Sequence, residues 1–165
     1  MTMPKDDKQK ANLVEEYKGL KNCCVVFPLA EGDGWKVAVA YGPTLRGHLI
    51  VSAVSKGGKG IEGGLRDQSP EALRKAFDGV IEGIRLFKEK LEPKLDRIYL
   101  GCFCDSGKFH FHLYPILQNQ KPCKGYALKW LGSFERRIPP DPDQIPKDDL
   151  RRLIDHINWS FQNLS

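Results

Sequence analysis

The chain has 165 residues, of which 41% are hydrophobic and 28% are charged, and its formal net charge at pH 7 is +5. This length suits one domain that buries roughly two thirds of its unfolded surface. No apolar run approaches the ~18 residues of a membrane span, and residues 1–8 contain no signal-peptide core, so we expect a cytoplasmic protein that does not bind membranes. The modest positive charge suits a small anion such as a nucleotide, whereas nucleic-acid binding usually needs a concentrated basic stripe.

The first half of the chain predicts one helix and several short strands. Apolar residues recur at helical spacing over 8–20, which favours a short amphipathic helix lying on a sheet. Short apolar runs bounded by Gly and Pro, including Pro28 and the turn at 31–34, predict strands over 23–27, 35–41 and 48–52. Their tight connections indicate an antiparallel meander. The glycine-rich segment 55–65 lacks the P-loop pattern, so we interpret it as a flexible connection or as a flap near an anionic ligand.

The main helix has the clearest signals. Ser69 is a good N-cap, Pro70 suits the first helical position, and Pro93 ends the pattern. One apolar stripe is expected to face the sheet and contains Leu73, Phe77, Val80, Ile84, Phe87 and Leu91. Gly79 and Gly83 lie beside this stripe and indicate a close backbone approach, either to the sheet or to a partner helix.

The second half of the chain predicts two further strands and a terminal helix. The first strand spans 97–104, and the three-residue loop 105–107 would join it to the next in a hairpin. Prolines make 138–146 an extended tether. A final helix from about 148 places on one side Leu150, Leu153, Ile154, Ile157, Phe161 and Leu164. His156 falls outside this apolar stripe, and we interpret it as a surface residue.

Residues 108–115 alternate strictly between polar and hydrophobic positions, as a half-buried strand does. The core face would hold Phe109, Phe111 and Leu113. The opposite face would hold Lys108, His110, His112 and Tyr114, with next neighbours roughly 7 Å apart. Neutral imidazoles near pH 7 are good nucleophiles, bases or ligands. Two of the chain's four histidines lie here, so we interpret this face as a candidate site, the alternative being an ordinary wet sheet surface.

The cysteines allow a second interpretation, in which the chain binds a metal ion. Five cysteines in a chain without an export signal favour thiols over a disulfide framework. If Cys104 pairs with Lys108 across the hairpin, Cys102 lies opposite His110. A tetrahedral zinc site could then be formed by Cys102, Cys104, His110 and His112. The alternative is that both thiols are small, half-buried hydrophobic groups.

The histidine strand resembles the signature of the histidine triad (HIT) superfamily, His-φ-His-φ-His-φ-φ, where φ is hydrophobic. Starting the match at Lys108 keeps the last two histidines, whereas starting it at His110 puts Tyr114 third; the first register also places Pro115 where many members have proline. Residues 46–51, Arg-Gly-His-Leu-Ile-Val, look like the family's Gly-His-φ-φ-φ strand and add His48. The resemblance covers about 20–120 and, more loosely, the tail.

The resemblance implies an α+β fold in one domain, 1–165. An antiparallel meander of about five strands would carry one main helix and a C-terminal helix. Within it we expect an N-terminal extension or helix over 1–20, a HIT-like core over 21–120 and a tail with the terminal helix over 121–165. Family members bind nucleotides and are often homodimers, so the expected partners are a small nucleotide or phosphoramidate and a second copy of the chain.

The resemblance also implies the chemistry. His110 would attack an α-phosphate and form a nucleotidyl-histidine, as in a nucleotide hydrolase or nucleotidyl transferase. His112 would contact the phosphate or the leaving group, and His48 would lie behind it. Lys108 would orient His110 through its backbone carbonyl and add a cation near the phosphate. No cofactor is implied.

Two further features complete the predicted site. Ser106 and Gly107, in the loop before the histidine strand, are expected to contact the substrate together with Lys108. The family's ribose-binding acid or amide lies eight residues before the Gly-His histidine, and Ala40 stands at that position here. The alternatives to an enzyme are therefore an inactive nucleotide- or phosphate-binding module and the metal-binding protein described above.

Overall fold

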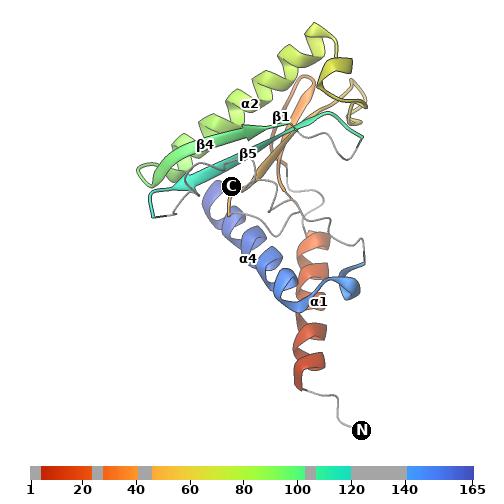
Figure 1. Cartoon of the computed structure of the whole chain (residues 1–165), viewed down its shortest axis with the longest axis vertical. Coiled ribbons are helices and arrows are strands. Elements are labelled where there is room, and N and C mark those ends of the chain that lie inside the picture. The colour runs from red at the N-terminus through yellow and green to blue at the C-terminus, as the bar shows by residue number, and fades with distance from the viewer. Residues whose placement is uncertain (1–4, 24–27, 41–45, 103–106, 120–140) are drawn as a thin grey trace.

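The structure, a computed structural model, describes residues 5–23, 28–40, 46–102, 107–119 and 141–165. These segments form the expected α+β architecture, an antiparallel sheet with long helices (Figure 1). The helices are α1 (Lys5–Cys23), α2 (Pro70–Leu91) and α4 (Lys147–Leu164), and the 3₁₀ turns are η1 (Leu65–Asp67) and η2 (Pro142–Gln144). The strands are β1 (Pro28–Gly32), β2 (Trp35–Val39), β3 (Leu49–Ala53), β4 (Leu95–Gly101) and β5 (His110–Leu117). None of the helices in these segments could cross a membrane.

The sheet has the strand order β1-β2-β3-β5-β4, and every neighbouring pair is antiparallel. β5 lies between β3 and β4, so its backbone is hydrogen-bonded on both sides. The predicted alternation is confirmed, because Phe109 and Phe111 are buried in the hydrophobic core on the α2 side of the sheet. On the opposite face, Ile50 pairs with His112 and Ser52 pairs with His110.

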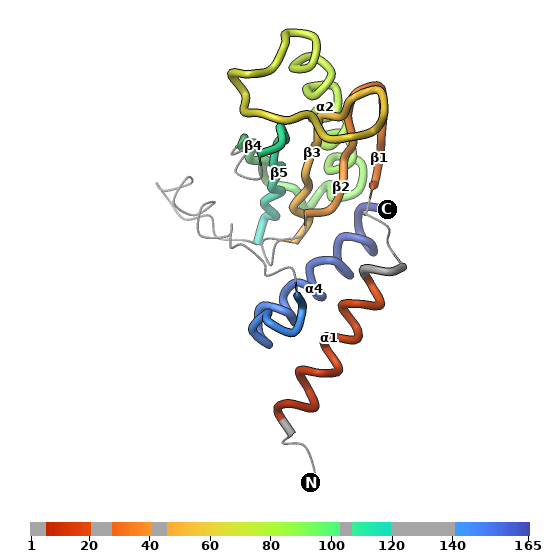
Figure 2. Tube along the Cα trace, turned by 90° about the vertical axis from the view of Figure 1, so that its right-hand side faces the viewer, coloured from red at the N-terminus to blue at the C-terminus, as the bar shows by residue number. Residues whose placement is uncertain are grey.

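The helix α2 spans the predicted residues and crosses one face of the sheet (Figure 2). The side chain of Ser69 accepts a hydrogen bond from the backbone N–H of Ala72 at 3.1 Å, as an N-cap does. Gly79 and Gly83 allow the helix to approach its own sheet. A Cβ on Gly79 would lie 2.7 Å from Val51 Cγ1, and one on Gly83 would lie 2.4 Å from Leu113 Cδ1.

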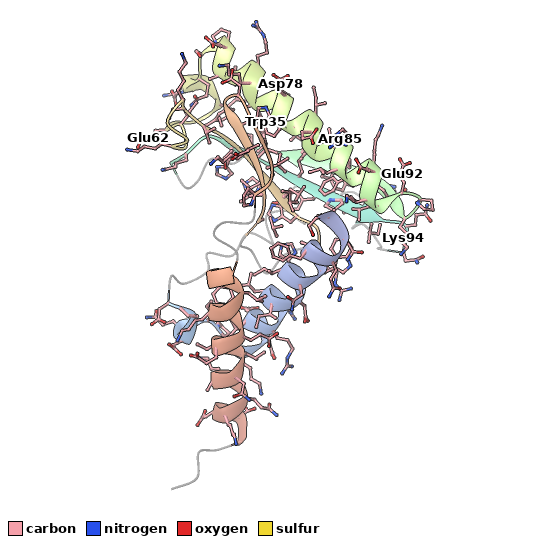
Figure 3. The ribbon with its side chains drawn as sticks, turned by 180° about the vertical axis from the view of Figure 1, so that it is seen from behind. Trp35, Glu62, Asp78, Arg85, Glu92 and Lys94 are labelled. Atoms are coloured by element: carbon pink, nitrogen blue, oxygen red, sulfur yellow. The ribbon has the colours of Figure 1, made fainter. Side chains whose placement is uncertain are left out.

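Two apolar residues of α2 are more exposed than is usual for an amphipathic helix. Phe77, expected in the apolar stripe, is 45% exposed and Ile81 is 63% exposed. The stripe is therefore rotated from the predicted one, because the two glycines, rather than Phe77, occupy the centre of the helix–sheet contact. Figure 3 shows Asp78, Arg85 and Glu92 along the helix from behind, and Arg85 forms an i,i+3 ion pair and an i,i+4 ion pair with glutamates.

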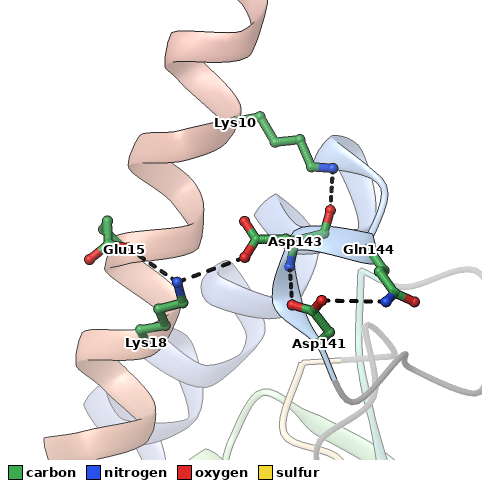
Figure 4. A network of polar contacts seen from close by, with 6 residues as sticks. All are labelled: Lys10, Glu15, Lys18, Asp141, Asp143 and Gln144. Atoms are coloured by element: carbon green, nitrogen blue, oxygen red, sulfur yellow. Dashed lines mark hydrogen bonds and ion pairs between the residues drawn. The ribbon is translucent and has the colours of Figure 1, made fainter.

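The helix α1 begins and ends within three residues of its predicted range, but it does not lie on the sheet. It packs against α4 and η2 below the sheet (Figures 1 and 2). Lys10 Nζ donates a hydrogen bond to the Asp143 carbonyl at 2.6 Å, and Lys18 Nζ lies 3.9 Å from an Asp143 carboxylate oxygen (Figure 4). Its buried face, with Val14 and Tyr17, is therefore covered by the C-terminal helix.

The first strand differs from the prediction. β1 begins at Pro28, which was expected to end a strand, and it continues through part of the predicted turn to Gly32. Because β1 is an edge strand, a proline that lacks an N–H can begin it without losing an interior ladder bond. Most of the predicted strand 23–27 lies outside the described residues. β2 and β3 agree with the predicted strands to within two residues.

The pairing of β4 with β5 is shifted by one residue from the expected hairpin. Gly101, rather than Leu100, lies opposite His112. β4 ends at Gly101 and β5 begins at His110, and residues 103–106, which include most of the predicted hairpin loop, lie outside the described residues. A shift of one residue exchanges the two faces of a strand.

Two connections are more ordered than predicted. The glycine-rich segment 55–65 is hydrogen-bonded to the ends of β3 and β5, because Ile61 N–H donates to the Ala53 carbonyl at 3.0 Å and Phe109 N–H donates to the Ile61 carbonyl at 2.8 Å. In the predicted extended tether, η2 forms one 3₁₀ turn and Ile145 is buried after it. Residues 138–140 of that tether lie outside the described residues.

Candidate functional site

Three of the predicted site residues meet on the sheet face opposite α2. His48 directly precedes β3, and His110 and His112 lie on the adjacent β5. Their exposed fractions are only 3%, 7% and 6%, respectively. These imidazoles are therefore buried, which excludes the interpretation of this face as an ordinary wet sheet surface.

The ring of His110 is fixed by the backbone of its own strand. Its Nδ1 lies 2.6 Å from the carbonyl oxygen of Lys108. Because a carbonyl oxygen can only accept a hydrogen bond, Nδ1 carries the proton and donates it. The lone pair of the neutral ring is then on Nε2, the atom that a nucleophilic histidine uses in this tautomer.

His48 and His112 form a hydrogen-bonded pair beside His110. His48 Nε2 lies 3.0 Å from His112 Nδ1, and their ring centroids are 5.2 Å apart. Burial, followed by the charges of the other three histidines, holds the pKa of His48 well below its usual range. His48 is therefore neutral near pH 7. Its hydrogen bond to His112 consequently involves no repulsion between two charged imidazoles.

Tyr114 contributes to this cluster, although the sequence placed it on the same face without indicating a role for it. Its ring stacks on His48 with centroids 4.1 Å apart and an interplanar angle of 20°, and it is fully buried. The stack restricts rotation of the His48 ring. The signal was present in the sequence, because Tyr114 continues the alternation of His110 and His112 on the same face.

The residues before His110 are only partly described. The side chain of Lys108 is exposed, and its Cδ lies 3.1 Å from the position that a Cβ on Gly60 would occupy. Gly107 is exposed with a φ of +73°, and its carbonyl accepts a hydrogen bond from Gly63 N–H at 3.1 Å. Ser106 lies outside the described residues. The structure therefore brings Lys108 and Gly107 next to the glycine-rich segment.

The arrangement of four zinc ligands is not supported. Because Gly101 lies opposite His112, Cys102 falls on the other face of the sheet, where it packs against the hydrophobic core. This corrects the predicted pairing of Cys102 with His110 and agrees with the alternative of a small half-buried hydrophobic group. Cys104 lies outside the described residues, and within the described ranges no group of three or more metal-ligating side chains is assembled.

His156 was expected at the surface, and this prediction is wrong. The residue is 1% exposed, and its Nε2 lies 3.1 Å from the carbonyl oxygen of Ala40. The apolar stripe of α4 did not predict the burial of His156, because α4 packs against α1 and also contacts α2. More than one face of this helix is therefore covered. Burial lowers the pKa of His156 to about 4, although the hydrogen bond to Ala40 acts in the opposite direction.

An antiparallel five-stranded sheet with one helix across a face and paired histidines on the other defines the fold class as HIT-like. Among solved structures, the chain is similar to a HIT-like protein of Bartonella henselae involved in cell-cycle regulation, whose crystal structure holds an unknown ligand. That likeness has 17% identity and a TM-score of 0.50, and it covers 84% of this chain and 92% of the other. It establishes the fold.

A second solved structure is a zinc-bound histidine triad family protein of Mycobacterium smegmatis. It has 16% identity and a TM-score of 0.47, and the likeness covers 88% of this chain and 93% of that chain. Neither a family model nor a curated protein sequence matches this chain.

Proposed function

We propose that this chain is a HIT-like nucleotide-binding protein that hydrolyses or transfers a nucleotidyl group by cleaving at the α-phosphate, with His110 as nucleophile. The observation that supports this most directly is the contact between His110 Nδ1 and the Lys108 carbonyl. This contact fixes the tautomer and the direction of the ring. It uses only the backbone of Lys108, so the absence of a histidine at position 108 does not remove it.

The proposed reaction has two steps. In the first, the lone pair of His110 Nε2 forms a bond to the α-phosphorus while the bond from phosphorus to the leaving group breaks. The leaving amine or oxygen takes a proton from His112, whose Nδ1 is hydrogen-bonded to His48. In the second, water or another acceptor attacks the phosphorus, loses a proton to the same imidazole, and the nitrogen–phosphorus bond breaks.

The test is turnover of adenosine phosphoramidate and of dinucleoside polyphosphates. We expect the parent to release a nucleoside monophosphate, and His110→Ala to lower kcat by at least about a thousandfold, as loss of a nucleophile does. Arg85→Ala, on the outer surface of α2, should retain parental turnover. Intact mass spectrometry should detect a nucleotidyl adduct in the parent and none in His110→Ala.

The thermal unfolding of His110→Ala should remain cooperative, which separates a chemical role from a folding defect. If the parent turns over no member of the panel and forms no adduct, the enzymatic proposal is wrong.

The second candidate function is a nucleotide- or phosphate-binding module without turnover, and Ala40 favours recognition of the phosphate over recognition of the ribose. Its methyl side chain is 1% exposed, and its backbone N–H and carbonyl are hydrogen-bonded to His48 and His156, respectively. Ala40 therefore supplies no ribose contact of the kind that the resemblance expects at this position.

Titration of the protein with AMP measures nucleotide affinity and so tests this second candidate separately from turnover. Charge reversal in Lys108→Glu should weaken AMP binding by about tenfold at low salt, since an exposed cation several ångströms from a phosphate contributes a screened attraction. Lys108→His should fold normally and bind as the parent does. Equal affinities of the parent and Lys108→Glu for AMP would mean that the lysine side chain takes no part in binding. Ser106 and Gly107 remain proposed substrate contacts.

A further inference from the structure

The chain's four histidines lie close together in the structure, although three separate parts of the sequence supply them. His48, His110 and His112 form the site on the sheet, and His156 reaches it from α4. His156 is the one that the proposed chemistry does not use. It is buried, and its polar contact is directed toward the strand that precedes His48.

The contact from His156 continues into the site through the backbone of Ala40. Because the Ala40 carbonyl only accepts, His156 Nε2–H is the donor at 3.1 Å. On the other side of the same residue, Ala40 N–H donates to the carbonyl of His48 at 2.9 Å. The ring of His48 then meets His112 Nδ1 at 3.0 Å. Three hydrogen bonds, linked through the backbone of Ala40 and through His48 from its carbonyl to its ring, therefore join α4 to the histidine on β5.

A second contact from α4 reaches the residue before His48. Gly47 has a φ of +81°, and a Cβ at this position would lie 3.0 Å from the ring of Trp159 and 2.8 Å from Pro115 Cγ. Trp159 lies three residues after His156 on the same helix. Thus α4 contacts Gly47, which precedes His48, and it also binds Ala40, whose N–H donates to the His48 carbonyl.

We propose that His156 is a positioning residue of the site, which orients His48 through Ala40 so that the His48–His112 pair keeps one tautomer. This inference rests on the proposed function only where turnover is concerned, since the tautomer of the pair is measurable without any substrate. Burial keeps His156 uncharged, so one ring nitrogen carries the proton, and the contact with the Ala40 carbonyl places that proton on Nε2.

The matched variants are His156→Leu and His156→Gln. Leucine fills similar space but has no donor, whereas the side-chain amide of glutamine can donate to the Ala40 carbonyl in place of Nε2. Asp155→Asn, at the exposed neighbouring position, is the control. The measurement is the ¹⁵N chemical shifts of the His48 and His112 ring nitrogens at pH 7.5, which report each tautomer.

We expect one tautomer of the pair in the parent, in Asp155→Asn and in His156→Gln, and a mixture in His156→Leu. With adenosine phosphoramidate, His156→Leu should lower kcat about tenfold with little change in KM, and His156→Gln should restore most of it. Unchanged ring shifts in His156→Leu would overturn the proposal, and so would equal perturbation by leucine and glutamine, which would indicate packing alone.

Two results keep the inference separate from the proposed function. If the parent shows no turnover, the function proposed above fails, and the ring shifts still decide the role of His156. If His156→Leu does not fold, the parent itself is tested: a slowly exchanging His156 Nε2–H proton supports the proposal, and protonation at Nδ1 instead of Nε2 overturns it.

Discussion

At the scale of single residues, the site depends on which imidazoles are kept uncharged. His48 and His156 are both buried, and burial lowers the pKa of each. A buried neutral histidine makes folding sensitive to pH, because the unfolded chain exposes it to water and allows it to take up a proton. The two buried histidines are therefore also a source of acid sensitivity.

His156 allows this sensitivity to be predicted with its sign. Between its ordinary pKa of 6.5 and its folded value of about 4, the unfolded state binds more protons than the folded state, so stability falls as pH falls through this window. The loss from this residue should approach about 3 kcal/mol at pH 4. Urea unfolding at pH 7.5, 6, 5 and 4.5 measures it.

The control for this prediction is His156→Gln, which keeps a donor and cannot be protonated. Its free energy of unfolding should fall less than that of the parent over the same pH range, and the difference between the two proteins removes the contribution of carboxylates common to both. Parallel pH dependences in parent and variant would contradict the assignment to His156.

Some of the residues at the site could be predicted from the sequence and others could not, and the difference has a physical reason. His110, His112 and His48 could be located because alternation and the Gly-His motif are local patterns. The contact between the Lys108 carbonyl and His110 was also expected, because the family resemblance implied it. His156 was missed because its burial depends on helices that pack against α4, and a single helical stripe does not contain that information.

At the scale of elements, the bounds of α2 were predicted correctly, whereas the pairing of β4 with β5 was not. The N-cap at Ser69 and the prolines at either end of α2 are local signals that act within a few residues. The register of β4 on β5 is not determined by the alternation within either strand, because a shift of one residue leaves both alternating patterns intact. This single shift placed Cys102 on the core face and removed the predicted zinc ligands.

The glycines of α2 and α1 give a contrasting prediction about packing. Gly79→Ala should lower the free energy of unfolding by about 1–2 kcal/mol, because its Cβ would lie 2.7 Å from Val51 Cγ1 and 3.0 Å from Trp35 Cβ, and overpacking outweighs the gain in helix propensity. Gly19→Ala in α1 meets nothing within 4 Å and should instead stabilise by up to about 1 kcal/mol.

Denaturant unfolding of both variants at pH 7.5 measures this contrast. The unfolding midpoint should fall for Gly79→Ala and rise for Gly19→Ala. A stabilised Gly79→Ala would mean that α2 does not approach β3 as closely as the structure indicates.

At the scale of the whole molecule, α2 has two large apolar side chains that are exposed. Phe77 and Ile81 lie four residues apart on α2, so they share one face of the helix. The glycines that first suggested self-association contact the chain's own sheet instead. These two exposed side chains are now the better reason to expect a homodimer.

Light scattering over a range of concentrations measures this prediction. We expect the parent to approach twice its chain mass of 18.7 kDa, and Ile81→Glu to remain a monomer because a charge in an apolar contact would lose its hydration. A mass of 18.7 kDa at every concentration in the parent would exclude the dimer.

The position of α4 in the chain has a consequence for how the site is made in the cell. α4 follows every strand in the sequence, so a ribosome produces His48, His110 and His112 before it produces His156. A nascent chain that has not reached Lys147 contains the proposed nucleophile but lacks the donor that binds the Ala40 carbonyl. Formation of the supported site therefore waits for translation of the last helix, and a product of premature termination would have the histidines without that support.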